Sequence, residues 1–198
     1  YRMTSYLGRL NYDYAGKYYV SGSFRRDGSS RLSRDSRWGN FWSVSGSWRL
    51  SQEAFMESLS NVITDAKIRA SYGVNGTQPK DYYGYMGVYE FGYNYNGNGG
   101  SSEARFYNPS LKWEKNYATN IGIDLTLFNR LTVSAEWYNR ETKDLLMDKP
   151  ISAAVGVINS SGVANMLVNV GSMRNRGFEL ELKSTNIQNK DLLWTTSL

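Results

Sequence analysis

Hydrophobic and polar residues alternate most regularly between Asn120 and Arg140. In the first half of this stretch the apolar residues share one face of an extended chain, and they are Ile121, Ile123, Leu125 and Leu127. After a turn at residues 128–130 the apolar set continues with Leu131, Val133, Ala135 and Trp137. The pattern predicts a β-hairpin with one apolar face and one polar face.

A hairpin of this kind has two interpretations. In a soluble sandwich the apolar face forms the core and the polar face meets solvent. In an outer-membrane barrel the apolar face meets lipid and the polar face lines the lumen. The loops and aromatic residues of the whole chain distinguish the two.

The same alternation predicts further strands. They cover residues 6–14, 18–24, 41–50, 66–74 and 177–184, and a last strand carries Trp194 and Leu198. The connections at 15–17, 128–130 and 185–191 are short, whereas those at 25–39, 75–117 and 141–174 are long. The moderate connection at 51–65 places Phe55, Met56 and Leu59 at helical spacing and predicts one or two helical turns. Short turns and long loops therefore alternate along the chain, as in outer-membrane barrels and unlike sandwiches.

Aromatic residues of the apolar set fall into two groups. One group lies near the short turns and contains Tyr12, Tyr14, Tyr18, Trp48 and Phe128, and the other lies near the long loops and contains Phe24, Trp42, Tyr72 and Trp137. Strand propensity alone explains any single one of them. Together they predict two interfacial girdles, and so an all-β fold of about eight antiparallel strands in an outer-membrane barrel rather than a soluble sandwich.

Composition narrows the possible chemistry. The 198 residues include no His and no Cys, which removes the commonest general base, the thiolate nucleophile and the usual zinc ligands. We expect no enzyme activity, no catalytic or metal site and no cofactor. The net charge of +5 comes from mixed signs and does not favour nucleic acid as a partner.

Charged residues on the polar face have two interpretations. The carboxylates Asp124, Glu136, Glu179 and Glu181 raise the question of glycoside hydrolysis, which needs two carboxylates at a defined separation. Basic residues are expected on the same face, namely Arg9, Lys67, Arg69 and Lys183. A charge lattice that braces a barrel wall is the simpler interpretation.

The predicted outer loops carry basic and aromatic residues. Arg25, Arg26, Arg31, Arg34 and Arg37 crowd one loop, where they are solvated or attract an acidic glycan or lipopolysaccharide phosphates. Candidate contacts for a ligand or partner are Tyr82, Tyr83, Tyr85, Tyr89, Tyr93 and Trp113, because such rings offer flat apolar faces with polar tips. The alternative is that these side chains pack the loop on itself.

Several segments, in order along most of the chain, are similar to one family. They are RRDGSSRL (25–32), WGNFWSVSGSWRLS (38–51), KIRASYGVNGT (67–77), NPSLKWE (108–114), NIGIDLTLFNR (120–130), WYNRETKDLL (137–146) and NVGSMRNRGFELEL (169–182). Together they resemble the C-terminal barrel region of SusC/RagA-type TonB-linked outer-membrane proteins.

The resemblance implies a Gram-negative outer-membrane importer of oligosaccharides or peptides. Its implied partners are a SusD-like surface lipoprotein, the TonB complex acting through an N-terminal region, and the lipid and lipopolysaccharide of the membrane. Residues 1–198 would then be a fragment of a large transmembrane outer-membrane β-barrel, without the plug and the remaining strands. Because both termini fall within alternating segments, we expect a piece of a longer polypeptide. The alternatives are a self-contained small barrel with a structural or adhesion role and a soluble carbohydrate-binding module.

Overall fold

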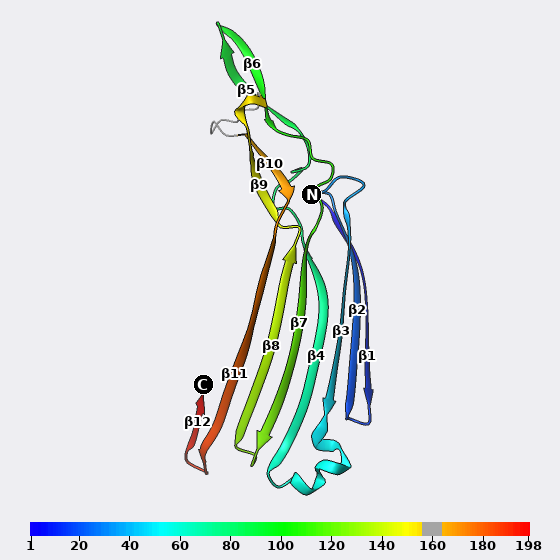
Figure 1. The fold of residues 1–198 in the computed structure, drawn as a ribbon, viewed down its shortest axis with the longest axis vertical. Coiled ribbons are helices and arrows are strands. Elements are labelled where there is room, and N and C mark those ends of the chain that lie inside the picture. Colours follow the sequence, from blue (N-terminus) through cyan, green and yellow to red (C-terminus); the bar gives the residue numbers. More distant parts are fainter. Residues whose placement is uncertain (156–163) are drawn as a thin grey trace.

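The computed structural model describes residues 1–155 and 164–198, and its main element is one eight-stranded antiparallel sheet (Figure 1). The strand order is β1-β2-β3-β4-β7-β8-β11-β12. The strands are β1 (Met3–Tyr14), β2 (Tyr18–Ser29), β3 (Trp38–Arg49), β4 (Ile63–Thr77), β7 (Glu114–Leu127), β8 (Leu131–Lys143), β11 (Ser172–Gln188) and β12 (Leu193–Ser197). The predicted all-β fold is confirmed.

Smaller elements lie in the connections. Two hairpins, β5 (Val88–Tyr95) with β6 (Asn98–Arg105) and β9 (Leu146–Ile151) with β10 (Ala164–Asn169), extend beyond one end of the sheet (Figure 1). Three 3-10 helices are η1 (Leu50–Gln52), η2 (Ala54–Leu59) and η3 (Ala153–Val155). In the described ranges no helix is both long enough and apolar enough to span a membrane.

The connections are sorted by length between the two ends of the sheet. The turns β1–β2, β7–β8 and β11–β12 and the η1–η2 segment all lie at one end, and the long connections lie at the other (Figure 1). The turn after β7 contains Phe128 and Asn129 with φ of 54° and 55°, a left-handed conformation that a tight hairpin turn requires. The predicted sorting of short turns and long loops is confirmed.

The strands are longer than the alternation predicts, so the predicted loop at 25–39 is wrong. Arg25, Arg26 and Asp27 still pair with β1 and β3, and the actual loop covers only residues 30–37. Likewise, β4 extends to Thr77, β7 begins at Glu114, and β11 begins at Ser172. Backbone pairing continues through polar residues here because a ladder is satisfied whatever its side chains.

The two faces of the sheet follow from its register. Directly paired residues share a face, and one such row is Tyr12, Val20, Gly46, Ala70, Ile121, Trp137 and Phe178. The neighbouring row is Asn11, Ser21, Ser45, Ser71, Asn120 and Tyr138. We call the sides carrying these rows the apolar face and the polar face.

The apolar face is open to its surroundings. Its predicted girdle residues are all exposed, from Trp48 at 37% to Phe128 at 60%, and Tyr18 stacks on Trp48 with ring centroids 6.1 Å apart. At the other end of the sheet, Trp42 contacts Tyr72 at 5.5 Å. An apolar face of this size left uncovered is unlike a dry sandwich core and matches a lipid-facing surface.

The buried core lies instead where the long loops meet the sheet. It consists of Leu32, Phe41, Leu111 and Trp113, with the rings of Phe41 and Trp113 edge to face at 5.3 Å. Gly39 and Gly76 make room for it, because a Cβ at either position would overlap the Phe41 ring. The sheet therefore has a loop-built cap at one end and open faces below it.

The sheet is open at both edges. β1 and β12 are the ends of the strand order, and in the described ranges they do not pair with each other (Figure 1). A self-contained barrel would need that pairing, and a soluble module would need its apolar face covered. Both alternatives therefore lack their defining feature.

Candidate functional site: the polar face and its loop cap

The polar face carries hydroxyl and amide groups bonded across strands. Ser21 and Ser45 share a hydrogen bond of 2.8 Å, and Ser23 and Ser43 share one of 2.7 Å. On the next strands, the Asn120 amide donates to the Ser71 hydroxyl over 3.3 Å. These pairs join β2 to β3 and β4 to β7 through side chains as well as backbone.

Arg69 is the centre of the charged part of this face. Arg69 lies on β4, and its guanidinium is 3.1 Å from the carboxylate of Asp124 on β7. The same guanidinium also pairs with Glu136 on β8. Asp124 in turn accepts a hydrogen bond of 2.6 Å from Ser134. Each of the three charged side chains is exposed by about a third or less, so the network is half-buried. It spans three strands.

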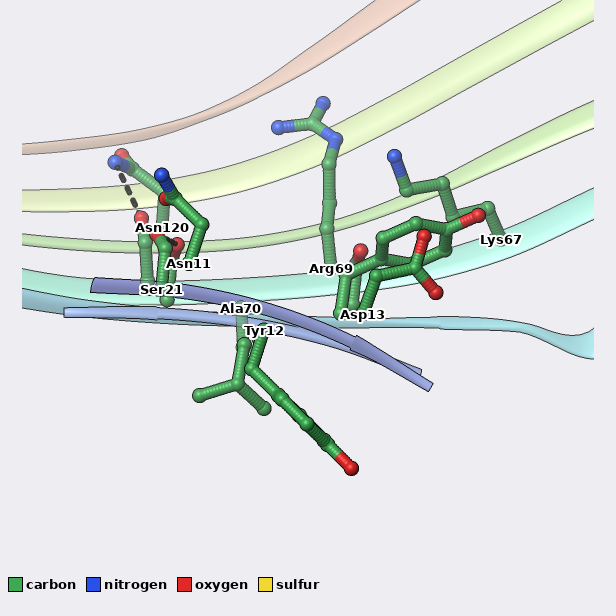
Figure 2. Close-up of a pocket in the computed structure, with 14 residues that line it drawn as sticks. Asn11, Tyr12, Asp13, Ser21, Lys67, Arg69, Ala70 and Asn120 are labelled. Atoms are coloured by element: carbon green, nitrogen blue, oxygen red, sulfur yellow. Dashed lines mark hydrogen bonds between the residues drawn. The ribbon is translucent and has the colours of Figure 1, made fainter. Parts of the chain in front are cut away.

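A hollow of about 430 Å³ lies on this face beside Arg69. Figure 2 shows Lys67, Arg69, Asn11 and Asp13 on one side of the sheet and Tyr12 pointing to the other. Lys67 also lies over the Tyr19 ring, 5.8 Å from its centroid. The hollow is therefore lined by charged groups and hydroxyls together with apolar surface, including Val20 and Ala70.

The charge lattice predicted for the polar face forms around Asp124 and Glu136. Glu179 lies directly opposite Glu136 in the register and is exposed, and Glu181 lies opposite Ser134. The Arg9 guanidinium donates to Asn11 over 3.1 Å, and Lys183 lies opposite Thr132. Across the described ranges, no three side chains of metal-binding type gather into a possible metal site. Among the described residues, the ion pairs of the predicted lattice are those of Arg69 with Asp124 and Glu136.

The predicted arginine loop is divided between a strand and a loop. Arg25 and Arg26 belong to β2, where Arg25 pairs with the buried Asp27 at 2.8 Å and Arg26 lies 5.1 Å above the Trp38 ring. Arg31 lies in the loop between two rings, 4.7 Å from each of Tyr1 and Tyr82, and donates to the Pro79 carbonyl over 2.7 Å. Contact with an anionic glycan stays a prediction.

The tyrosines and Trp113 singled out from the sequence occupy different environments. Tyr82 and Tyr83 are exposed near the start of the long β4–β5 connection, and Tyr89 is exposed on β5. Tyr93, on the same strand, donates to Glu90 over 3.3 Å. The structure therefore distributes these rings along the loop rather than gathering them in one site.

Trp113 and Tyr85 pack inward. Trp113 is 4% exposed, and its indole Nε1 donates to the Arg37 carbonyl over 2.9 Å, while Tyr85 packs against the same core. For these two residues the loop packs on itself, which is one of the two interpretations of the sequence. The run NPSLKW contains the signal, since Leu111 and Trp113 alternate with polar residues.

Two asparagines that sequence reasoning missed join the long loops. Asn169 accepts from the Lys112 amide over 2.8 Å, and its own amide donates to the carbonyls of Lys112 and Asp144 over 2.9 and 3.0 Å. Asn108 donates to the Leu167 carbonyl over 2.7 Å. Such side-chain-to-backbone bonds between distant segments leave no periodic signal, so only the structure reveals them.

Comparison with known proteins gives consistent matches over the whole chain. Residues 1–198 match the family model described as TonB dependent receptor-like, beta-barrel. The chain is 38% identical to TonB-dependent receptor P39 of Formosa agariphila and 34% identical to TonB-dependent receptor SusC of Bacteroides thetaiotaomicron, in each case over 98% of its length. It spans 18% and 20% of those two proteins.

Solved structures agree. The RagAB peptide transporter superposes with a TM-score of 0.86 at 32% identity, over 98% of this chain and 21% of that one. The siderophore receptor PirA from Pseudomonas aeruginosa gives a TM-score of 0.63 at 14% identity, over 98% of this chain and 33% of its own. The second likeness concerns the fold alone.

Proposed function

Because the chain belongs to the TonB-dependent receptor-like β-barrel family, we propose that it forms part of the barrel wall of an outer-membrane importer. The importer takes up oligosaccharides or peptides, draws its energy through TonB, and works with a SusD-like surface lipoprotein. Members of the family are outer-membrane β-barrels, so the eight-stranded sheet lies in the outer membrane.

One observation carries this proposal. The sheet has an exposed apolar face edged by aromatic rings and a polar face braced by the Arg69 network, and it superposes on the RagAB peptide transporter over 98% of its length. A barrel wall needs that division, because one side meets lipid and the other lines an aqueous interior. The similarity to the RagAB peptide transporter supports peptides as one of the two substrate classes.

Each part of the chain has a role in this proposal. The short turns face the periplasm and the long loops face the outside. The exposed rings of Tyr82, Tyr83 and Tyr89 contact the substrate or the lipoprotein, while Trp113 holds the loops on the sheet. The plug, the TonB-binding segment and the other barrel strands would lie in other parts of the full-length receptor.

The test uses the full-length receptor in its own bacterium. The receptor gene is deleted, and growth is measured on two defined carbon sources, a casein peptide digest and a maltooligosaccharide mixture. We expect the deletion to impair growth on one of them and the restored gene to rescue it. A receptor lacking its TonB-binding segment is the matched control for energy coupling, and it should reach the outer membrane without restoring growth.

Two results would contradict the proposal. Equal growth of the deletion strain and its parent on both carbon sources would remove the importer role. Full rescue by the receptor without its TonB-binding segment would remove the energy coupling. Purification of the tagged receptor adds a third readout, because we expect a lipoprotein encoded nearby to copurify with it.

A further inference from the structure

The segment between β3 and β4 carries apolar side chains that no other described part of the chain covers. It contains η1 and η2 and lies beyond the short-turn end of the sheet (Figure 1). Phe55 is 62% exposed, Leu59 46% and Val62 42%. Exposed apolar side chains cost free energy in water unless an apolar partner covers them.

The geometry of η2 separates its apolar and polar side chains. In a 3-10 helix, residues three apart lie in one row along the axis. Met56 and Leu59 therefore share one row, and Ala54 and Glu57 share another. The short helix thus presents an apolar side, flanked by Phe55, and a separate side that carries Glu57.

Glu53, the residue just before η2, fixes this segment to the wall. Its carboxylate accepts hydrogen bonds from the Tyr18 hydroxyl over 2.7 Å and from the Trp48 indole over 3.1 Å. The Lys17 ammonium lies 3.1 Å from the same carboxylate. We call Glu53 with its partners Tyr18, Trp48 and Lys17 the Glu53 node. Because these donors come from the β1–β2 turn, β2 and β3, the segment is held at a definite height against the sheet.

Phe55 continues the apolar face directly. Its ring meets Trp48 edge to face at 6.5 Å, and Trp48 belongs to the girdle that also contains Tyr18 and Tyr14. β3 and β4 each pair with a strand on both sides, so further barrel strands cannot approach here. The plug would lie against the opposite, polar face. Lipid is the environment continuous with this surface.

We propose that η2 is an interfacial anchor that inserts Phe55 and Leu59 into the periplasmic-leaflet phospholipids of the outer membrane. Tyr and Trp side chains favour the interface because their rings are apolar and their polar tips reach water. Two such rings, those of Tyr18 and Trp48, lie at that level, and their polar tips donate to the Glu53 carboxylate. The anchor fixes the depth of the barrel at the β3–β4 connection.

The test measures the surroundings of each side chain. Single cysteines are introduced by F55C and L59C into the full-length receptor, after serine has replaced any cysteine outside residues 1–198, and each is labelled with a nitroxide. The receptor is reconstituted in vesicles of phosphatidylethanolamine and phosphatidylglycerol. Collisions with oxygen, which dissolves in lipid, are compared with collisions with a water-soluble nickel chelate. E57C is the matched control in the same helix.

We expect oxygen collisions to exceed nickel collisions at 55 and 59, with the order reversed at 57. Equal, high nickel collisions at all three positions would show that the segment stays in water and would overturn the proposal. Low collision rates with both reagents at 55 and 59 would show protein contact and would also overturn it. Heat-modifiable migration on a gel confirms that each labelled receptor is folded.

Discussion

At the residue scale, Arg69 shows how the wall depends on paired charge. Its guanidinium serves Asp124 and Glu136 together, so Arg69→Met leaves two carboxylates facing each other. Because 35% of the side chain is exposed, we expect a loss of only about 1 kcal/mol, the low end for an unpaired charge. Urea unfolding of the full-length receptor in vesicles measures this.

Lys67→Met is the matched control, since the Lys67 ammonium contacts only the Tyr19 ring among the interactions described above. Its urea midpoint should stay near that of the unsubstituted receptor. If the two variants lose the same stability, the network around Arg69 has no special part in the wall.

Gly76 is the second residue whose identity matters. A methyl group there would overlap the Phe41 ring, which is buried beneath the loops. We expect Gly76→Ala to cost about 1–3 kcal/mol through overpacking. Gly8→Ala is the control because nothing lies within 4 Å of its Cβ, and the prediction is wrong if both variants unfold at the same urea concentration.

Glu53 gives a dependence on pH. Hydrogen bonds from Tyr18, Trp48 and Lys17 hold the pKa of its carboxyl below the ordinary value. A lowered folded-state pKa means that the node stabilises the receptor above the unfolded-state pKa, and that this stability is lost as pH falls through the folded-state value.

We expect Glu53→Gln to flatten the acid part of the stability curve, measured as the urea midpoint from neutral pH downward. Glu57→Gln, whose carboxylate is outside the node, should keep the original slope. An unchanged slope in Glu53→Gln would exclude the node as its source.

The placement of individual side chains could be predicted from the sequence only where the residues alternate regularly. Alternation places Arg69 and Asp124 on one face, and the structure confirms that they meet. The burial of Trp113 depends on the Arg37 carbonyl, 76 residues away in the chain, which no local pattern encodes.

At the element scale, the long loops are held by a small core and not by the sheet alone. Leu111 is fully buried against Leu32 and Trp113. Truncating such a leucine lowers stability by about 2–5 kcal/mol, and here we expect the loss to destabilise the packing of the loops. We expect Leu111→Ala to speed tryptic cleavage after Lys112 in the folded receptor by at least tenfold, with the barrel intact.

Tyr89→Ala is the control at this scale, because the Tyr89 side chain is 66% exposed on β5. It should leave the cleavage rate unchanged. Equal cleavage of Leu111→Ala and the unsubstituted receptor would show that the core does not hold the loops.

Element types were more predictable than element lengths. The β7–β8 hairpin and its turn at 128–130 were predicted correctly, because the alternation on both strands points to the same turn. Strand β2 runs past Phe24 because Asp27 remains paired with β1 and β3, and Ser29 with β1, and both are buried despite their polarity. The β5–β6 hairpin lies within a segment whose Tyr, Gly and Asn content indicates a loop, although its two-residue turn at Asn96 and Gly97, both with positive φ, is a local hairpin signal. The β9–β10 hairpin lies within the predicted long connection at 141–174, where no regular alternation marks it.

At the scale of the whole molecule, the sheet of the described residues has two unpaired edges and an exposed apolar face. Residues 1–198 expressed alone without detergent should therefore aggregate, as unpaired strands and apolar patches promote association. Size-exclusion chromatography with light scattering measures this, and a monodisperse soluble monomer would contradict it.

One face of this sheet meets lipid and the other does not, and this division can be tested directly along β7. It is tested by placing a bimane fluorophore on single cysteines at positions 120 to 125 of β7 in the full-length receptor, in vesicles containing doxyl-labelled phospholipid. Quenching should alternate, strong at 121, 123 and 125 and weak at 120, 122 and 124, because β7 spans the membrane with its odd positions outward. Uniform quenching, or strong quenching at the even positions, would show that the apolar face does not meet lipid.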